Sequence, residues 1–128
     1  MKTTLTIEES ARLIELGVDA KLASKGNSAM QVCTNGRRIT RILEPRPIFE
    51  LSDLLSILPK EIEDNGITDT LNIWVADNEW CVKYEPASDE FISLADSYYE
   101  SPELIDALNQ LLIWCLENNH IKTERNEQ

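Results

Sequence analysis

The stretch LNIWVADNEWCVKYE, which runs from Leu71 to Glu85, decides the fold because it has the pattern of two β-strands joined by a tight turn. Asp77 and Asn78 lie between two runs rich in β-branched and aromatic residues, and both tolerate the positive φ angles of a type I′ turn. A two-residue turn sets the pairing and places Trp74 opposite Cys81. Because side chains alternate along a strand, one face carries an apolar set: Leu71, Ile73, Val75, Trp80, Val82 and Tyr84.

The two tryptophans of this hairpin therefore belong to opposite faces. We expect Trp80 in the core with the apolar set. Trp74 shares the other face with Cys81, so either a helix covers that face too or Trp74 is an exposed aromatic residue that marks a contact surface.

A second hairpin is predicted in AMQVCTNGRRITRIL, residues 29–43. Its Asn35-Gly36 pair favours a type I′ turn, which places Val32 opposite Ile39 and Cys33 opposite Arg38. Neither face is uniformly apolar, so we expect this hairpin at an edge of the sheet, with a weakly specified register.

Helix signals come first near the amino end of the chain. Thr6 followed by Glu9 forms a capping box, which predicts the start of a helix, and Gly17 can supply the left-handed residue that ends it. Asp19 then caps a short turn or helix that runs through Ser24.

The middle helix is predicted in FELSDLLSILPKEI, residues 49–62, where leucines recur at helical spacing. It is capped by Ser52 or begins a turn earlier. Pro59 ends its first part, and a one-turn continuation through residues 60–62 is allowed because proline is tolerated in a first turn.

The last helix has the clearest signals. Ser101 is the expected N-cap and Pro102 the first helical residue. The apolar residues that follow span an arc of roughly 200°, against about 100° for an ordinary surface helix. We expect this helix to be the spine of the core or to bury one flank against another chain.

These elements predict an α+β fold. We expect an antiparallel sheet of four or five strands, built from the two hairpins and packed on helices in two layers, with the long C-terminal helix in the core. The segment EFISLA (90–95) is the candidate fifth strand. At 128 residues the chain has the size of one domain, 1–128, of which residues 122–128 look like a flexible tail.

The composition is that of a globular protein and excludes some classes. No apolar run reaches the roughly 18 residues of a membrane span, and the N-terminus has no hydrophobic signal core, so we expect a cytoplasmic protein with no membrane contact. The three cysteines, Cys33, Cys81 and Cys115, are far apart and odd in number, which argues against a disulfide framework.

The net charge of −11 hides an asymmetry. Up to Arg46 the chain has eight basic and five acidic residues, whereas from Pro47 onward it has four basic and eighteen acidic residues. Each part supplies one candidate surface. The candidate basic surface is Arg37, Arg38, Arg41 and Arg46 around the first hairpin, and the candidate acidic interaction surface is Glu85, Asp89, Glu90, Asp96, Tyr98, Tyr99 and Glu100. Charges that solubilise an edge strand or a loop are the alternative explanation for each.

Signals for chemistry are weak. His120, the only histidine, lies past the last helix in a polar segment, and nothing there would fix it for nucleophilic catalysis. The cysteines include no pair at metal-ligand spacing. We therefore expect no catalytic residue, no metal and no cofactor, while a carboxylate-dependent hydrolase stays open because acidic residues are abundant.

Two resemblances bear on function. The segments LTIEESARLIELGVDAKLAS, LSDLLSILPKEI and SPELIDALNQLLIWCLENN resemble recurring pieces of small uncharacterised proteins of phages, prophages and other mobile elements. That resemblance implies a genomic setting and no particular activity. LTIEESARLIELGV (5–18) is also similar to the first helix of excisionase-like helix-turn-helix domains, but the following DAKLAS is too short for a recognition helix.

The leading hypothesis is a non-enzymatic, acidic protein-interaction module of a mobile element, of an inhibitor, immunity or accessory type. It would act through its acidic C-terminal region or by self-association as a homodimer, and we expect no small-molecule ligand. The alternative is a nucleic-acid-associated accessory protein that binds through the arginine-bearing first hairpin.

Overall fold

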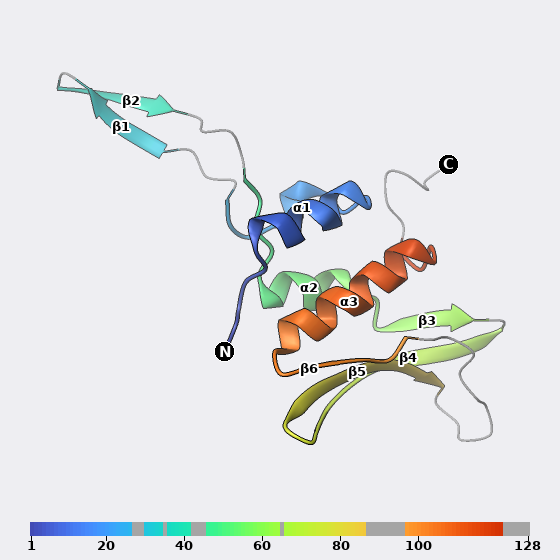
Figure 1. Cartoon of the computed structure of the whole chain (residues 1–128). Helices are drawn as coiled ribbons and strands as arrows, with labels where there is room; N and C mark the ends of the chain where they lie inside the picture. The colour runs from blue at the N-terminus through green and yellow to red at the C-terminus, as the bar shows by residue number, and fades with distance from the viewer. Residues whose placement is uncertain (27–29, 35, 42–45, 65, 87–96, 122–128) are drawn as a thin grey trace.

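The computed structural model describes residues 1–26, 30–34, 36–41, 46–64, 66–86 and 97–121, and all structural statements refer to them. Along the chain the elements are α1 (Ile7–Glu15), a 3-10 helix (Ala20–Leu22), β1 (Met30–Thr34), β2 (Arg37–Arg41), α2 (Leu51–Ile57), β3 (Glu61–Asp64), β4 (Ile67–Ala76), β5 (Glu79–Pro86), β6 (Tyr99–Ser101) and α3 (Leu104–Glu117). Strands β3-β4-β5-β6 form an antiparallel sheet, and α3 packs on its last two strands with α2 against α3 (Figure 1). The α+β class and the core position of the last helix are confirmed.

The hairpin β4–β5 has the predicted register throughout. Trp74 pairs with Cys81, and the pairing continues to Ala76 and Glu79 at the turn. Asp77 and Asn78 have φ angles of 52° and 62°, as a type I′ turn requires. The turn chemistry therefore sets which residues share a face.

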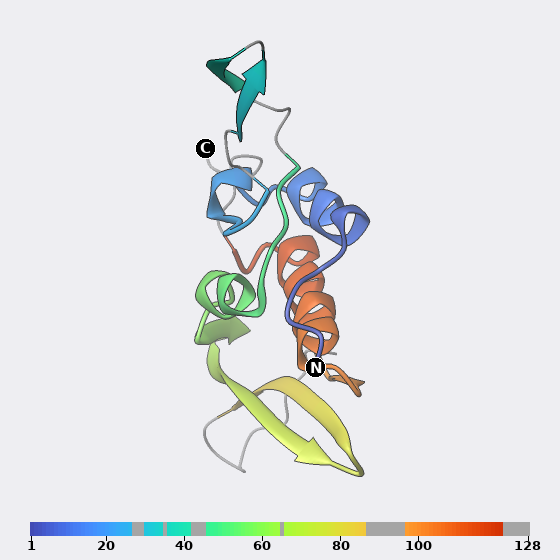
Figure 2. The same cartoon turned by 90° about the vertical axis from the view of Figure 1, so that its left-hand side faces the viewer.

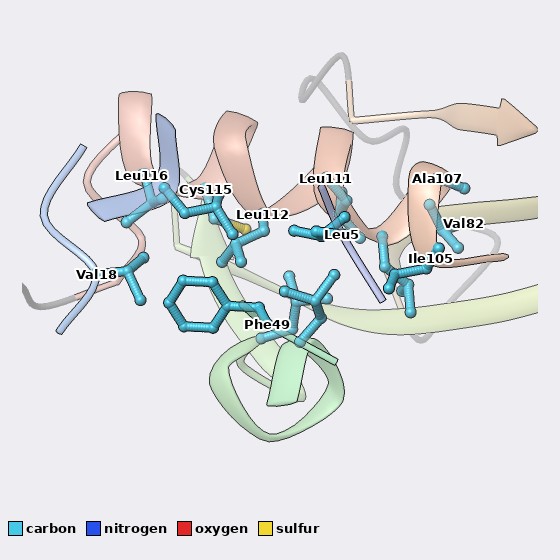
Figure 3. Close-up of a cluster of buried hydrophobic side chains, with 14 of the residues drawn as sticks. Leu5, Val18, Phe49, Val82, Ile105, Ala107, Leu111, Leu112, Cys115 and Leu116 are labelled. Atoms are coloured by element: carbon cyan, nitrogen blue, oxygen red, sulfur yellow. The ribbon is translucent and has the colours of Figure 1, made fainter. Parts of the chain in front are cut away.

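The core lies between this sheet and the helices. Figure 3 shows α3 side chains meeting Phe49, which precedes α2, and Val82 of β5. Residues of α3 that are almost or fully inaccessible to solvent include Ile105, Ala107, Leu108, Leu111, Leu112, Cys115 and Leu116. Fully burying one leucine or isoleucine contributes about 1.5–3 kcal/mol, so α3 is the largest single contributor to the core.

Caps at two helix starts come from polar side chains. The amide of Glu9 donates to Thr6 Oγ1 at 3.1 Å, and the Thr6 amide donates to the Glu9 carboxylate at 2.9 Å, which confirms the capping box. Helix α2 begins at Leu51, before the alternative cap Ser52, and there the Glu50 amide donates to Asp53 Oδ2 at 2.8 Å. Asp19 caps the short 3-10 helix, as expected, and its Oδ1 accepts from the Lys21 amide at 2.9 Å.

The predicted helical continuation after Pro59 is wrong, because Glu61–Asp64 forms strand β3. Leu58 has a ψ angle of 127°, which fits the steric restriction that a proline imposes on the residue before it. The chain leaves Pro59 extended, pairs with β4 and buries Ile62 in the core.

The start of α3 also differs from the expected one. Ser101 is the last residue of β6, and its hydroxyl accepts from the Glu103 amide at 3.2 Å. Helix α3 begins at Leu104, so Ser101, the predicted N-cap, belongs to strand β6 instead. The candidate strand EFISLA and the expected tail 122–128 lie outside the described residues.

The first hairpin forms with the predicted pairs, Val32 with Ile39 and Cys33 with Arg38. Its place in the sheet is a correction: β1 and β2 form a separate two-stranded sheet, and the larger sheet contains β3 and β6 instead. Figures 1 and 2 show this hairpin at the opposite end of the molecule from the four-stranded sheet.

The base of this hairpin is held by Gly26 and Arg46. The Arg46 amide donates to Gly26 O at 2.9 Å. Gly26 has a φ of +83°, and a Cβ atom there would lie 1.8 Å from Arg46 O. Only glycine fits this close approach.

The apolar set of the β4–β5 hairpin is not buried along its whole length. Val82 and Tyr84 are fully buried, but Ile73 is 38% exposed and Val75 57% exposed. Trp80, which we expected in the core, is only partly buried and does not belong to the core cluster. The physical reason is length, because the tip of the hairpin extends past the end of α3 (Figures 1 and 2).

Candidate functional site

The sheet has two unlike faces. Alternation from the observed register gives the face away from α3 five glutamates, Glu61, Glu63, Glu79, Glu85 and Glu100, and one basic residue, Lys83. Trp74 and Cys81 belong to the same face. In the described parts of the chain, no helix lies on this side of the sheet (Figure 1). We call this surface, together with Tyr98, which contacts Trp74, the acidic face.

An aromatic pair lies within the acidic face. The ring centroids of Trp74 and Tyr98 are 6.0 Å apart, and their planes meet at 45°. Tyr98 precedes β6 and is 43% exposed, whereas Trp74 is partly buried. Both predicted alternatives for the second face are therefore wrong: no described helix covers Trp74, and Trp74 is not exposed, because the Tyr98 side chain packs beside it.

Tyr98 is held in place by polar contacts. Its hydroxyl donates to Glu100 Oε2 at 2.9 Å and lies 3.5 Å from Cys81 Sγ. These contacts, with Cys81 first and Glu100 second, raise the pKa of Tyr98 above its ordinary value. Cys81 is fully buried on this face.

The electrostatic character of the acidic face is negative. Lys83 Nζ lies 3.9 Å from Glu85 Oε1, a long and solvent-exposed pair of little energetic weight. Glu61, Glu63 and Glu100 are exposed. Carboxylates around aromatic rings can receive guanidinium or ammonium groups, by charge-assisted hydrogen bonds and by cation–π contact.

The structure brings only part of the predicted acidic surface together. Glu85, Tyr98 and Glu100 lie on the acidic face with Trp74, which we had singled out separately. Tyr99 pairs with Val82, so it belongs to the inner face of the sheet, and it packs against the core. The remaining members of that surface, Asp89, Glu90 and Asp96, lie outside the described residues.

The predicted basic residues gather at the other end of the molecule. Arg37, Arg38 and Arg41 are on β2, and we call β1–β2 with these residues the arginine hairpin. Arg46 is exposed near its base. The helices lie between the arginine hairpin and the four-stranded sheet in Figures 1 and 2, so the two candidate surfaces of one chain are well separated.

Nucleophilic groups in the described core are protonated and enclosed. Burial raises the pKa of the Cys115 thiol to about 11, and burial with the neighbouring Cys115 raises the pKa of Tyr84. The Tyr84 hydroxyl donates to Pro59 O at 2.6 Å. A protonated, buried thiol is a poor nucleophile, so these residues act in packing.

His120 is more ordered than its position in the sequence suggests. Its ring stacks on Trp114, with centroids 4.8 Å apart, and its amide donates to Cys115 O at 2.9 Å. Next to it a shallow hollow of about 340 Å³ is lined by Tyr99, Gln110, Ile113, Trp114, Glu117 and Asn118. His120 lies over one face of the indole and Tyr84 lies near it at 6.3 Å, so Trp114 is poorly placed for stacking with a ligand.

The described residues also bear on metal binding, membrane insertion and DNA recognition by a helix-turn-helix domain. No group of three or more histidine, cysteine, aspartate and glutamate side chains there could hold a metal ion. No helix of that part of the chain is long and apolar enough to cross a membrane. After α1 the chain forms only the three-residue 3-10 helix, where a helix-turn-helix domain would place its recognition helix.

Comparison with known proteins adds no relative: no family model, no curated protein and no solved structure matches the chain. The site therefore has to be interpreted from its own geometry.

Three glutamates of the acidic face, Glu61, Glu63 and Glu79, do not belong to the predicted acidic surface. The predicted helical continuation covers Glu61, and no strand is predicted at Glu63, whereas both residues lie on β3. Asn65-Gly66 is the same type of hairpin signal that identified the other two hairpins, and Gly66 has a φ of +81°. That signal could have identified strand β3 and thus both residues.

Proposed function

We propose that this protein is a non-enzymatic interaction module that binds a basic segment of a partner protein on its acidic face. The single observation that carries the proposal is the set of five glutamates on the sheet face that no described helix covers, with the Trp74–Tyr98 pair on the same face near Glu79 and Glu100. Aromatic residues are enriched at protein interfaces, and clustered negative charge accelerates encounter with a basic partner.

A pair of matched variants tests this function. In the first, Glu61, Glu63 and Glu100 become Gln; in the control, Glu8, Glu15 and Glu117 become Gln. All six side chains are exposed, so both variants change the net charge equally. The probe is an oligo-arginine peptide, with an oligo-glutamate peptide of the same length as the negative probe, and binding is measured by calorimetry.

The expected result is a loss of roughly tenfold in oligo-arginine affinity for the acidic-face variant, since each exposed charge pair contributes about 0.2–1 kcal/mol. The control should lose much less. Equal losses in the two variants would mean that the peptide responds only to net charge, and the acidic face would then have no special role.

The setting of this module is also a proposal. We infer a phage, prophage or other mobile element, on the strength of the resembling segments, and an inhibitor, immunity or accessory role. We place the protein in the cytoplasm, which is in keeping with the free, buried thiols of Cys81 and Cys115. The neighbouring genes test this setting: a toxin, integrase or restriction system beside the gene supports it, and a housekeeping operon contradicts it.

A nucleic-acid-associated function is the second candidate. The observation that favours it is the projecting two-stranded arginine hairpin, because the major groove of DNA admits a β-ribbon. DNA binding that weakens steeply with salt and vanishes when Arg37, Arg38 and Arg41 become Ala would favour it over the first proposal. If the protein does not bind DNA even at low salt, the nucleic-acid-associated function is excluded.

A further inference from the structure

Strand β4 is longer than the strand that pairs with it on its outer side. β3 pairs with residues 67–70, and one further bond joins the Leu71 amide to Lys60 O at 2.9 Å. Residues 72–76 pair with β5 on one side, and no described strand pairs with them on the other (Figure 1). We call this side of residues 72–76 the open edge.

The register shows which backbone groups face the open edge. The Leu71 amide points to the side of β3, because it donates to Lys60 O. The backbone groups of successive strand residues point to alternate sides, so those of Ile73 and Val75 face the open edge, whereas Trp74 pairs with Cys81 of β5. Exposed backbone groups of this kind form a template for another strand.

The side chains of the open edge do not guard it. Edge strands are commonly protected by charged residues or proline, and residues 72–76 contain neither. Ile73 and Val75 are exposed on the inner face of the sheet, past the end of α3. An uncharged strand with β-branched residues fits this edge best, and the same segment of a second copy has that character.

The open edge is complementary to itself. Antiparallel pairing of two copies about a two-fold axis at Trp74 places Ile73 of each copy opposite Val75 of the other. These are hydrogen-bonded pairs, because the backbone groups of both residues face the edge. The exposed Ile73 and Val75 side chains of both copies then meet on one face of the joined sheet.

The charges at the two ends of the open edge also match. Lys60 lies beside Leu71 at one end, and Asp77 follows Ala76 at the other. Both side chains are exposed, and neither forms a salt bridge with another described residue. Antiparallel pairing brings Asp77 of each copy next to Lys60 of the other, so opposite charges meet at both ends.

We propose that two copies of this chain pair through the open edges of β4, so that their four-stranded sheets become one continuous sheet. The contact is isologous and closes as a dimer. The inference goes beyond the proposed function and does not depend on it, because pairing along an edge leaves the acidic face of each copy uncovered.

Sedimentation velocity with matched variants tests the dimer. The wild-type sedimentation coefficient should rise with concentration, up to about 1 mM, where even a weak contact is populated. Val75→Lys places a charge among the aliphatic side chains of the interface and should weaken association by at least roughly tenfold. The control Leu22→Lys makes the same kind of change at another exposed apolar residue and should associate like the wild type.

A second pair of variants tests the charges. Lys60→Glu replaces attraction by repulsion at both ends of the interface and should weaken association by roughly tenfold. Lys21→Glu changes the net charge equally at an exposed lysine away from the edge and should have no such effect. Equal losses in these two variants would overturn the pairing register.

Amide hydrogen exchange of the wild type tests the register without any substitution. At the concentration where about nine tenths of the chains are paired, the Ile73 and Val75 amides should exchange roughly tenfold more slowly than in dilute protein. The Trp74 amide, which faces β5, should change much less.

Three outcomes overturn the inference: a wild type that stays monomeric at the highest concentration, undiminished association of Val75→Lys, and association that leaves exchange of the Ile73 and Val75 amides unchanged. If the wild type is monomeric but the oligo-arginine peptide slows exchange of these two amides, the open edge binds a strand of another protein and a second copy is the wrong occupant.

Discussion

The two faces of the four-stranded sheet are formed by the same strands but differ in burial and in charge. On the inner face Val82 and Tyr84 are fully buried against the helices, whereas the outer face carries five glutamates and the Trp74–Tyr98 pair. The two faces differ because successive side chains along each strand point to opposite sides of the sheet. If the acidic face binds a partner as proposed, substitutions at neighbouring positions of one strand should change stability and binding independently.

The largest expected effect is on the inner face. Tyr84→Ala removes a fully buried ring and its hydrogen bond to Pro59 O, and should lower the free energy of unfolding by about 3–5 kcal/mol. Urea unfolding followed by circular dichroism measures this change. A loss below about 1 kcal/mol would show that the inner face does not hold the core.

A buried carboxylate should behave unlike those of the acidic face. Asp53 accepts from the amides of Glu50 at 2.8 Å and Ser24 at 2.9 Å, and from the Ser24 hydroxyl. Burial acts to raise the pKa of Asp53, but these hydrogen bonds outweigh it and lower the pKa below its ordinary 3.8. Asp53→Asn should lower the free energy of unfolding by about 2–3 kcal/mol at neutral pH.

The pH dependence follows from the sign of that shift. Because the folded-state pKa of Asp53 is below the unfolded value of 3.8, its stabilisation is complete well above pH 3.8 and is lost as the pH falls through the folded pKa. The difference between wild type and Asp53→Asn should therefore shrink in acid. A difference that is constant from neutral pH to pH 3 would contradict this account of Asp53.

A smaller effect on stability is expected at Trp74. Trp74→Ala removes the contact with Tyr98, which corresponds to about 0.5–1.5 kcal/mol for an aromatic pair, and the burial of a partly buried ring, which adds to that loss. Oligo-arginine binding should nevertheless fall more than it does in Tyr84→Phe, a variant on the inner face. Unchanged binding in Trp74→Ala would remove the aromatic pair from the binding site.

The smallest effect on stability is expected for the glutamates themselves. Changing Glu61, Glu63 and Glu100 to Gln should alter the free energy of unfolding by less than about 0.5 kcal/mol, since exposed positions tolerate substitution. The free energy of unfolding should rise slightly, because removing like charges from an acidic protein reduces electrostatic repulsion within the chain. Thermal unfolding checks this, and a drop of several degrees in Tm would show that these residues support the sheet.

How far the sequence predicts this structure depends on the range of the interactions. The β4–β5 register follows from two turn residues, and the start of α1 follows from Thr6 and Glu9, because both signals are local. Strand β6 depends on pairing with β5 and carries no local strand signal that outweighs the Ser101-Pro102 helix start. The separation of the first hairpin from the sheet also depends on contacts that are distant in sequence.

The sequence predicts single residues of the acidic face but not how they are grouped. Parity placed Trp74 away from the apolar set, and composition marked Tyr98 and Glu100 as acidic surface. What joins them is the pairing of β6 beside β5, which brings Tyr98 within contact of Trp74. Glu61 and Glu63 are absent from the predicted surface because the sequence predicts a helical continuation through residue 62 and no strand where β3 forms.

The most direct test of the central claim uses the three tryptophans, which lie in different places. Trp74 is on the acidic face, Trp80 on the opposite face of the same hairpin, and Trp114 on α3 beside the shallow hollow. Their indole N–H groups give separate signals in a nitrogen-proton NMR spectrum, which can be followed while the oligo-arginine peptide is added. Binding on the acidic face predicts that the Trp74 signal shifts most and the Trp114 signal stays in place. A shift confined to Trp114, or equal small shifts of all three, would contradict the account.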